Sequence, residues 1–147
     1  MQSATPQPVM RHILNTSGIT RFTEEQMEAV RLGIGLYGIS ACGMDTDLRT
    51  VSTLKTTILQ IKELDEDQTV GYSRRGVLTR RSRIAAIPIG YADGLNRHLG
   101  NRKGAVVVNG KRAPIVGNIC MDVCMIDVTD IDCKEGDRVE IFGEQLP

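Results

Sequence analysis

The strongest candidate for a reactive residue in this sequence is a tyrosine that follows an apolar run. The run covers residues 84–89 and stops at Gly90; Tyr91 follows, and then the turn-forming pair Asp93 and Gly94. At the end of a buried strand, a tyrosine either packs its ring in the core or uses its hydroxyl to transfer protons. An ordinary phenol stays protonated at neutral pH, so a tyrosine base needs cations or several hydrogen bonds around it. The position alone leaves both interpretations open.

Arg31 is the cation that the sequence offers to such a site. It lies between two apolar neighbours, Val30 and Leu32, near the expected end of a helix. The helix dipole favours a cation there, which is the simpler interpretation. The functional alternative is a buried guanidinium that donates hydrogen bonds to a ligand atom.

A short polar turn could bind an anion. Residues 15–18 read Asn-Thr-Ser-Gly and follow the first apolar run, while Gly33 and Ile34 precede the next one. In α/β barrels, the loops after the last strands bind phosphate through backbone N–H groups and hydroxyls. On spacing alone, an ordinary turn and an ordinary helix end are the simpler interpretation.

Asp122 is the remaining candidate, an acid flanked by Met121 and Val123. In an apolar setting, a carboxylate is expected to pair with a cation or to accept hydrogen bonds. Cys120 and Cys124 have the spacing of one strand face, so we expect small apolar side chains rather than redox groups.

The elements around the polar turn have the pattern of a strand, a helix and a second strand. Residues 9–14 are mostly apolar, and residues 34–39 are apolar with two glycines. Thr23 and Gln26 have the spacing of a capping box, which predicts a helix that ends near Gly33. One helix and two strands cannot close a core. We therefore expect the rest of an α/β domain on the N-terminal side of this segment.

From residue 48 onward the pattern changes to short strands without a convincing helix. Asn109-Gly110 is the strongest hairpin signal in the chain, and residues 135–137 predict another turn. Strands at this spacing predict an antiparallel barrel or sandwich, with the domain boundary at residues 43–47. The predicted strands lie within residues 51–64, 70–74, 84–89, 105–108, 112–116, 124–128 and 138–142.

Composition excludes several classes of function. The chain has 18 basic and 18 acidic residues, which argues against a nucleic-acid surface or a polybasic membrane surface. No apolar run approaches the ~20 residues of a membrane span, and the N-terminus lacks the features of a signal peptide. Four cysteines and two histidines show no zinc-binding spacing. We expect a cytoplasmic protein with reduced cysteines and no metal.

Five segments, taken in order, resemble alanine racemase, a fold-type III enzyme that uses pyridoxal 5'-phosphate (PLP). They are residues 12–17, 31–38, 70–72, 90–94 and 115–122. The turn at residues 15–19 and residues 95–97 also resemble racemases that are fused behind a cell-wall ligase.

The resemblance implies a mainly β fold. Residues 44–147 would form a C-terminal antiparallel β-barrel or sandwich domain, in truncated form. Residues 9–43 would be the last strand-helix-strand of a PLP-binding α/β (TIM) barrel, and residues 1–8 a disordered or loop lead-in. Asn118 stands where many relatives have arginine.

The resemblance also implies how PLP would be held. Arg31 matches the arginine that donates to the pyridine nitrogen, a role that suits a group that can donate but not accept. Thr16 matches the hydroxyl that binds the phosphate, and the amides of Gly33 and Ile34 match its backbone ligands. The lysine that holds PLP as a Schiff base matches no part of this chain.

The implied reaction is the interconversion of L-alanine and D-alanine for peptidoglycan synthesis, by two-base proton transfer on a PLP aldimine. Tyr91 matches the catalytic tyrosine, and the missing lysine would act on the opposite face. Met121 matches the residue whose amide receives the substrate carboxylate, and Asp122 adjoins it.

The implied enzyme is a homodimer in which the β domain of one subunit brings its tyrosine to the PLP of the other. The chain by itself is then expected to be inactive. The alternatives are a racemase for serine or another small amino acid and a non-catalytic β dimerisation module. A PLP decarboxylase fits less well, because Arg31 takes the place of an acid at the pyridine nitrogen.

Overall fold

The structure, a computed structural model, describes residues 9–43 and 47–146. Its contacts divide the chain into two compact units, residues 1–52 and 53–147. Within the described residues, no helix is long and apolar enough to cross a membrane.

The first unit contains two short parallel strands with a helix between them. The strand β1 (His12–Asn15) pairs with β2 (Ala29–Arg31). The helix α1 (Thr16–Arg21) begins directly after β1, because the Asn15 side chain accepts a hydrogen bond from the N–H of Gly18 at 3.0 Å and caps it. Two 3₁₀ turns, Thr23–Glu25 and Ile34–Tyr37, complete the unit.

The predicted helix from Thr23 to the region of Gly33 is wrong. Only one 3₁₀ turn forms at Thr23, no side chain caps it, and the Gln26 side chain donates instead to the carbonyl of Ile19 at 3.4 Å. The residues expected in the second half of the helix form β2. These residues pair with β1, and the hydrogen bonds of that pairing outweigh the local preference for a helix that the capping signal indicates.

The second strand predicted at residues 34–39 is also wrong. Residues Ile34–Tyr37 form a 3₁₀ turn that ends at Gly38, whose φ of 77° lies in the left-handed region. The Thr16 hydroxyl accepts hydrogen bonds from the N–H groups of Gly33 at 2.9 Å and Gly35 at 3.4 Å. These bonds fold the segment back onto the start of α1 instead of extending it.

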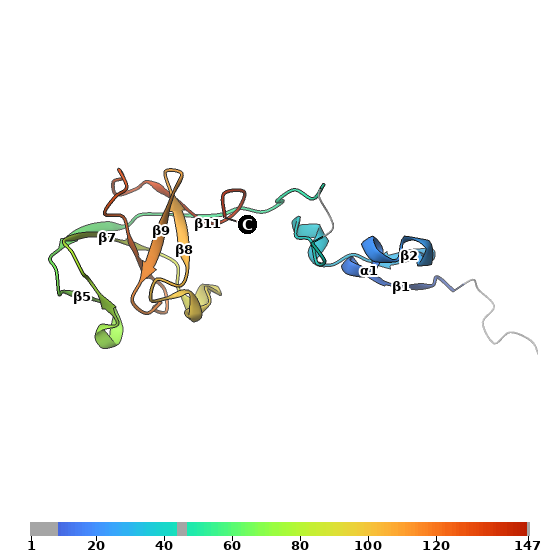
Figure 1. The fold of residues 1–147 in the computed structure, drawn as a ribbon, viewed down its shortest axis with the longest axis horizontal. Coiled ribbons are helices and arrows are strands. Elements are labelled where there is room, and N and C mark those ends of the chain that lie inside the picture. The colour runs from blue at the N-terminus through green and yellow to red at the C-terminus, as the bar shows by residue number, and fades with distance from the viewer. Residues whose placement is uncertain (1–8, 44–46, 147) are drawn as a thin grey trace, which may run out of the picture. The chain divides into compact units, whose positions relative to one another are not determined.

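The second unit is built on one antiparallel sheet, as expected from the sequence (Figure 1). Its spatial order is β3-β11-β8-β9-β10-β7-β4, and every neighbouring pair is antiparallel. The strands are β3 (Leu54–Thr57), β4 (Gln60–Leu64), β7 (Ser82–Ile87), β8 (Ala105–Val108), β9 (Lys111–Val116), β10 (Cys124–Asp127) and β11 (Arg138–Phe142).

The sheet curls because its two edge strands are joined by only two residues. Ile58 donates to the carbonyl of Asp137 at 2.9 Å and Leu59 to that of Ala86 at 2.9 Å, so the link bonds to both ends of the sheet. The curled sheet encloses the main core. Its most central side chains include Ile87, Val106, Ile115, Ile126 and Val139, each no more than 1% exposed.

This unit contains two hairpins. The predicted Asn109-Gly110 hairpin is confirmed between β8 and β9, with φ of 47° and 76° as a tight two-residue turn requires. A smaller hairpin pairs β5 (Thr69–Val70) with β6 (Gly76–Val77). Its connection contains the 3₁₀ turn Tyr72–Arg74.

Candidate active site

The second unit contains a pocket of about 490 Å³ at the ends of its strands. Three connections line it: the turn after β5, the turn after β7 and the segment between β9 and β10. The lining residues are Tyr72, Ser73, Tyr91, Arg97, Asn118, Ile119, Cys120, Met121 and Asp122. Three residues predicted for the site from the sequence, Tyr91, Met121 and Asp122, therefore share one pocket.

Two backbone hydrogen bonds join the turn after β7 to the segment after β9. Tyr91 N–H donates to the carbonyl of Cys120 at 2.9 Å, and Ala92 N–H donates to that of Met121 at 3.0 Å. Gly90 permits this close approach, because a Cβ there would lie 2.1 Å from the Met121 oxygen. The carboxylate of Asp93 accepts a bond from Gly90 N–H at 2.9 Å and closes the turn.

Tyr91 lies half-exposed beneath a cation. The guanidinium carbon of Arg97 lies 5.3 Å from the centroid of its ring, within the range of a cation–π contact. Arg31, the cation that the sequence suggested for this role, belongs to the other unit. Arg97 was missed because it is six residues away in sequence, and only the 3₁₀ turn Arg97–Leu99 returns it to the pocket.

Met121 and Asp122 end the segment that follows β9. Among the described residues, none accepts a hydrogen bond from the N–H of Met121, so this donor is available to a ligand. Asp122 was expected to need a partner, and this expectation is wrong. Its side chain is exposed, and water solvates a carboxylate that its apolar neighbours in sequence do not cover.

Tyr72 is a second phenol in the same pocket. Its side chain is 72% exposed, against 40% for Tyr91. Its turn is strained, since Ser73 and Arg74 have φ of 59° and 52°, beside a φ of 78° at Gly71. Non-glycine residues in this region cost about 1–3 kcal/mol each and cluster at functional sites. The sequence already pointed to Tyr72, because residues 70–72 are one of the five segments that carry the family resemblance. That resemblance assigned the segment no role.

In the first unit, the structure brings Thr16 and Gly33 together. The Thr16 side chain is 8% exposed, and its oxygen accepts the bonds from Gly33 and Gly35. A hydroxyl that accepts two bonds keeps its own proton to donate. A Cβ at Gly35 would lie 2.9 Å from the Thr16 methyl, so a side chain does not fit there. Gly33 and Ile34 are themselves exposed.

Arg31 lies at the end of β2, directly opposite Asn15 in the parallel pair. Its Nη2 donates to the carbonyl of Ile13 at 3.0 Å, and the side chain is exposed. The expectation of a cation at the end of a helix is wrong, because the residue belongs to a strand. The bond to β1 holds the guanidinium of Arg31 beside that strand. Its other N–H groups remain as donors for a ligand.

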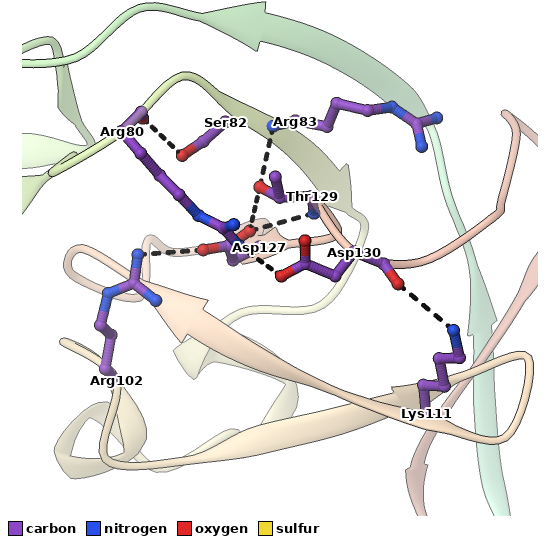
Figure 2. Close-up of polar contacts among 8 residues, drawn as sticks. All are labelled: Arg80, Ser82, Arg83, Arg102, Lys111, Asp127, Thr129 and Asp130. Atoms are coloured by element: carbon purple, nitrogen blue, oxygen red, sulfur yellow. Dashed lines mark hydrogen bonds and ion pairs between the residues drawn. The ribbon is translucent and has the colours of Figure 1, made fainter.

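At the end of β10, a polar network around Asp127 links the strand to the loops beside it (Figure 2). Asp127 accepts a bond from Arg102 Nη2 at 3.0 Å and two from Thr129, at 3.1 Å from the N–H and 2.5 Å from the hydroxyl. Burial raises the pKa of Asp127, but the bonds from Thr129 and Arg102 outweigh it, so that the pKa lies below its usual value. The network also pairs Arg80 with Asp130.

The cysteines of this unit are thiols. Cys124 is fully buried on β10, as predicted, but Cys120 precedes the strand and is only partly buried, so the two do not share a strand face. Burial, with a smaller contribution from Cys120, raises the pKa of Cys124 to about 12. Within the described residues, no three His, Cys, Asp or Glu side chains are grouped so that they could hold a metal ion.

The comparisons with known proteins agree over most of the chain. Residues 51–147 match the family described as "Alanine racemase, C-terminal domain". Alanine racemase 2 of Caldanaerobacter subterraneus subsp. tengcongensis is 46% identical over 140 residues, which cover 92% of this chain and 36% of the relative. The alanine racemase of Clostridium tetani is 41% identical over 140 residues, with the same coverage. The chain thus spans about a third of the length of the curated relatives it matches.

Solved structures give the same result. The alanine racemase from Bartonella henselae with covalently bound pyridoxal phosphate superposes with a TM-score of 0.86 at 38% identity, over 96% of this chain and 40% of that chain. The enzyme from D-cycloserine-producing Streptomyces lavendulae also gives a TM-score of 0.86, at 30% identity, over 94% of this chain and 37% of that chain. These similarities confirm the mainly β fold expected from the sequence.

Proposed function

This chain belongs to the alanine racemase family, and on that premise we propose that it forms the C-terminal part of an enzyme that interconverts L-alanine and D-alanine. The observation that carries the proposal is the pocket of the second unit. It combines two phenols, a free backbone N–H and an arginine in one space. These are the groups needed to hold an amino acid by its carboxylate and to exchange its α-proton.

The carboxylate of the substrate is proposed to bind at Met121. The N–H of this residue is unused by the described residues, while the carbonyl of Cys120, which lies in the same peptide plane, is fixed by its bond from Tyr91 N–H. The amide therefore has a set direction before the substrate arrives. Arg97, in the same pocket, adds a positive charge that favours an anionic group. Asp122 is proposed to remain in water and to limit the net charge of the pocket.

The proton-transfer group is proposed to be one of the two phenols, and the resemblance assigned this role to Tyr91. Its turn is fixed to the segment after β9 by the bonds from Tyr91 N–H to Cys120 and from Ala92 N–H to Met121. Arg97 places a cation over its ring. Tyr72 lies in the same pocket and is the more exposed of the two phenols. Either phenol needs a second base on the opposite face to invert the α-carbon.

PLP is the cofactor that the family implies, and the residues of the first unit fit it. The Thr16 hydroxyl is preoriented by two N–H groups and keeps a proton for a phosphate oxygen. Ile34 is proposed to add its amide, and Gly33 to share the N–H that it now donates to Thr16. Arg31 is proposed to donate to the pyridine nitrogen. When bound, PLP withdraws electrons and so makes the α-proton easier to remove.

The complete site is proposed to need more than this chain. The lysine that would carry PLP is expected from the part of the relatives that the chain does not span. The first unit exposes many apolar side chains, among them Ile13, Phe22, Leu36 and Tyr37, which suits a segment that the rest of a barrel would cover. We further propose a homodimer, a role in D-alanine supply for peptidoglycan, and a cytoplasmic location.

A chimera tests the proposed function. Residues 9–147 would replace the matching C-terminal part of alanine racemase 2 of Caldanaerobacter subterraneus subsp. tengcongensis, and racemisation of L-alanine would be followed by circular dichroism. We expect activity in the chimera and none in the 147-residue chain with added PLP. A folded chimera that binds PLP but does not racemise alanine would overturn the proposal. Faster turnover of serine than of alanine would identify serine as the preferred substrate.

The two tyrosines of the pocket supply matched variants for the same assay. Replacing the proton-transfer phenol by Phe should lower kcat by about 100-fold or more, the usual contribution of a positioned acid or base, and replacing the other should cost less than about tenfold. On the assignment from the resemblance, Tyr91→Phe gives the large loss and Tyr72→Phe the small one. If Tyr72→Phe gives the large loss and Tyr91→Phe the small one, the assignment of Tyr91 is wrong.

A further inference from the structure

The Asn109-Gly110 turn is the strongest hairpin signal of the sequence, and the proposed function gives it no role. We propose that Asn109 is a site of deamidation, a reaction that the native hairpin prevents and an opened hairpin permits. The product cannot restore the bonds that the amide makes, so the modification weakens the closure of the sheet. The inference is independent of the proposed function, because Asn109 does not line the candidate active site.

The reaction is intramolecular at first and then consumes one water. The backbone nitrogen of Gly110 attacks the side-chain carbonyl carbon (Cγ) of Asn109, and the bond from Cγ to Nδ2 breaks. The N–H proton of the glycine leaves with Nδ2 as ammonia, and a five-membered succinimide ring remains. Water then opens the ring to aspartate or to its β-linked isomer, isoaspartate. The attacking nitrogen is unshielded, since a Cβ at Gly110 would meet nothing within 4 Å.

The folded turn keeps the two reacting atoms apart. The φ values of 47° at Asn109 and 76° at Gly110 are those of a type I′ turn, in which the first central residue has ψ of about 30°. At that ψ, the nitrogen of Gly110 points nearly opposite to the Cβ of Asn109, whereas ring closure requires the two to be almost eclipsed. The rotation that brings them together breaks the pairing of Val108 with Lys111. The hairpin must therefore open before the ring can form.

The side-chain amide is held as well. Its Nδ2 donates to the carbonyl of Asp132 at 2.9 Å and to Oδ2 of Asp137 at 3.3 Å. Both acceptors belong to the loop between β10 and β11. The hairpin makes a further bond to this loop, from Lys111 Nζ to the carbonyl of Asp130 at 3.3 Å (Figure 2). The leaving nitrogen is thus fixed in the folded state, and the same two bonds tie the hairpin to the loop.

Deamidation turns these two bonds into repulsions. A carboxylate oxygen takes the place of Nδ2 and faces the carbonyl of Asp132 and the carboxylate of Asp137, neither of which can donate to it. Asp137 lies where the curled sheet closes, because Ile58 N–H donates to its carbonyl at 2.9 Å and Gly136 N–H donates to that of Ile58 at 2.8 Å. A change at the tip of the hairpin therefore acts on the closure of the sheet.

The first measurement is peptide mass spectrometry of the 147-residue chain after incubation at pH 8, with and without urea. In urea, Asn109 should convert to aspartate and isoaspartate. Without urea, the conversion should be at least about tenfold slower, because only the opened fraction of the chain reacts. Equal rates would show that the hairpin gives no protection, and no conversion in urea would show that Asn109 is not a modification site.

The second measurement is amide hydrogen exchange of Asn109→Asp, which carries the side chain of the product from the start. The amides of Ile58 and Gly136, which close the sheet, should exchange about tenfold faster or more than in the wild type. The amide of Arg102 bonds to the carbonyl of Ile115 at 2.7 Å, at the other end of the hairpin, and should keep its rate. Faster exchange at all three amides would mean a general loss of stability and would contradict the local effect.

Asn101→Asp is the matched control. This residue also has positive φ, of 55°, and its Nδ2 also donates to one oxygen of a loop, Oδ1 of Asn118 at 3.1 Å. It makes no bond to the loop that closes the sheet, so its substitution should leave exchange at Ile58 unchanged. If Asn109→Asp leaves Ile58 and Gly136 unchanged too, the proposed link between the amide and the closure is wrong.

Discussion

Gly90 offers the sharpest test of how the pocket is assembled. Its φ of −141° and ψ of −167° suit any residue, so an alanine at this position adds no backbone strain. Its added Cβ would lie 2.1 Å from the oxygen of Met121 and 2.4 Å from that of Cys120. Gly90→Ala therefore perturbs the site only through steric contact with the backbone of Cys120 and Met121.

The structure sets the size of the effect. Real Cβ atoms stay at least 3.0 Å from such an oxygen, so the two segments must separate by nearly 1 Å. The hydrogen bonds at Tyr91 and Ala92, of 2.9 and 3.0 Å, then become too long to count. Two net hydrogen bonds are worth about 1–3 kcal/mol, and overpacking adds about 1–3 kcal/mol. We expect a loss of about 2–6 kcal/mol in the free energy of unfolding.

Urea unfolding of the chain, followed by far-ultraviolet circular dichroism, measures this loss as a lower midpoint, by about 1–3 M at an m-value of ~2 kcal/mol/M. Gly94→Asn is the control in the same turn. Its Cβ meets nothing within 4 Å, and asparagine tolerates the φ of 95° better than other side chains. A loss below about 0.5 kcal/mol for Gly90→Ala, or an equal loss for Gly94→Asn, would refute the steric argument.

Three further predictions concern the core and its charges. Asp127→Asn should make stability less sensitive to acid: the lowered pKa of Asp127 stabilises the fold above its usual value near 3.8, and this contribution is lost as the pH falls through the folded-state pKa. Urea midpoints at pH 6 and pH 3 check this, and an equal acid sensitivity in both proteins would contradict it. Cys124, with a pKa raised to about 12, should resist iodoacetamide at pH 8 until urea unfolds the chain, as mass spectrometry can show. Since the unfolded thiol ionises near 9.0, stability should also fall as the pH rises above that value. Ile126→Ala, at a fully buried position of β10, should cost about 2–5 kcal/mol in urea unfolding, and a cost below about 1 kcal/mol would show that the core collapses around the cavity.

The β unit could be predicted closely because its signals are local. Residues 105–108 and 138–142 were predicted as strands, and β8 and β11 have those bounds. The hairpin at Asn109-Gly110 follows from two residues that tolerate positive φ. Alternation and turn chemistry act over a few residues, so they are visible in the sequence.

The first unit could not be predicted in the same way, because its elements depend on partners far along the chain. The capping signal at Thr23 is real in sequence, but parallel pairing with β1 turns Ala29–Arg31 into a strand. The Thr16 hydroxyl binds N–H groups 17 and 19 residues later and bends the segment after it. Local propensity is weak compared with such contacts.

The sequence by itself determined the family and the candidate residues Tyr91, Met121 and Asp122, because the order of the motifs is specific even where each motif is weak. Only the tertiary structure decided which groups meet in one pocket. It placed Arg97 over Tyr91, left Asp122 in water, and put Tyr72 in the same space, held by Asn118. The physical reason is that a pocket is made where separate loops converge, and their distances follow from strand order and register, which no single stretch of sequence contains.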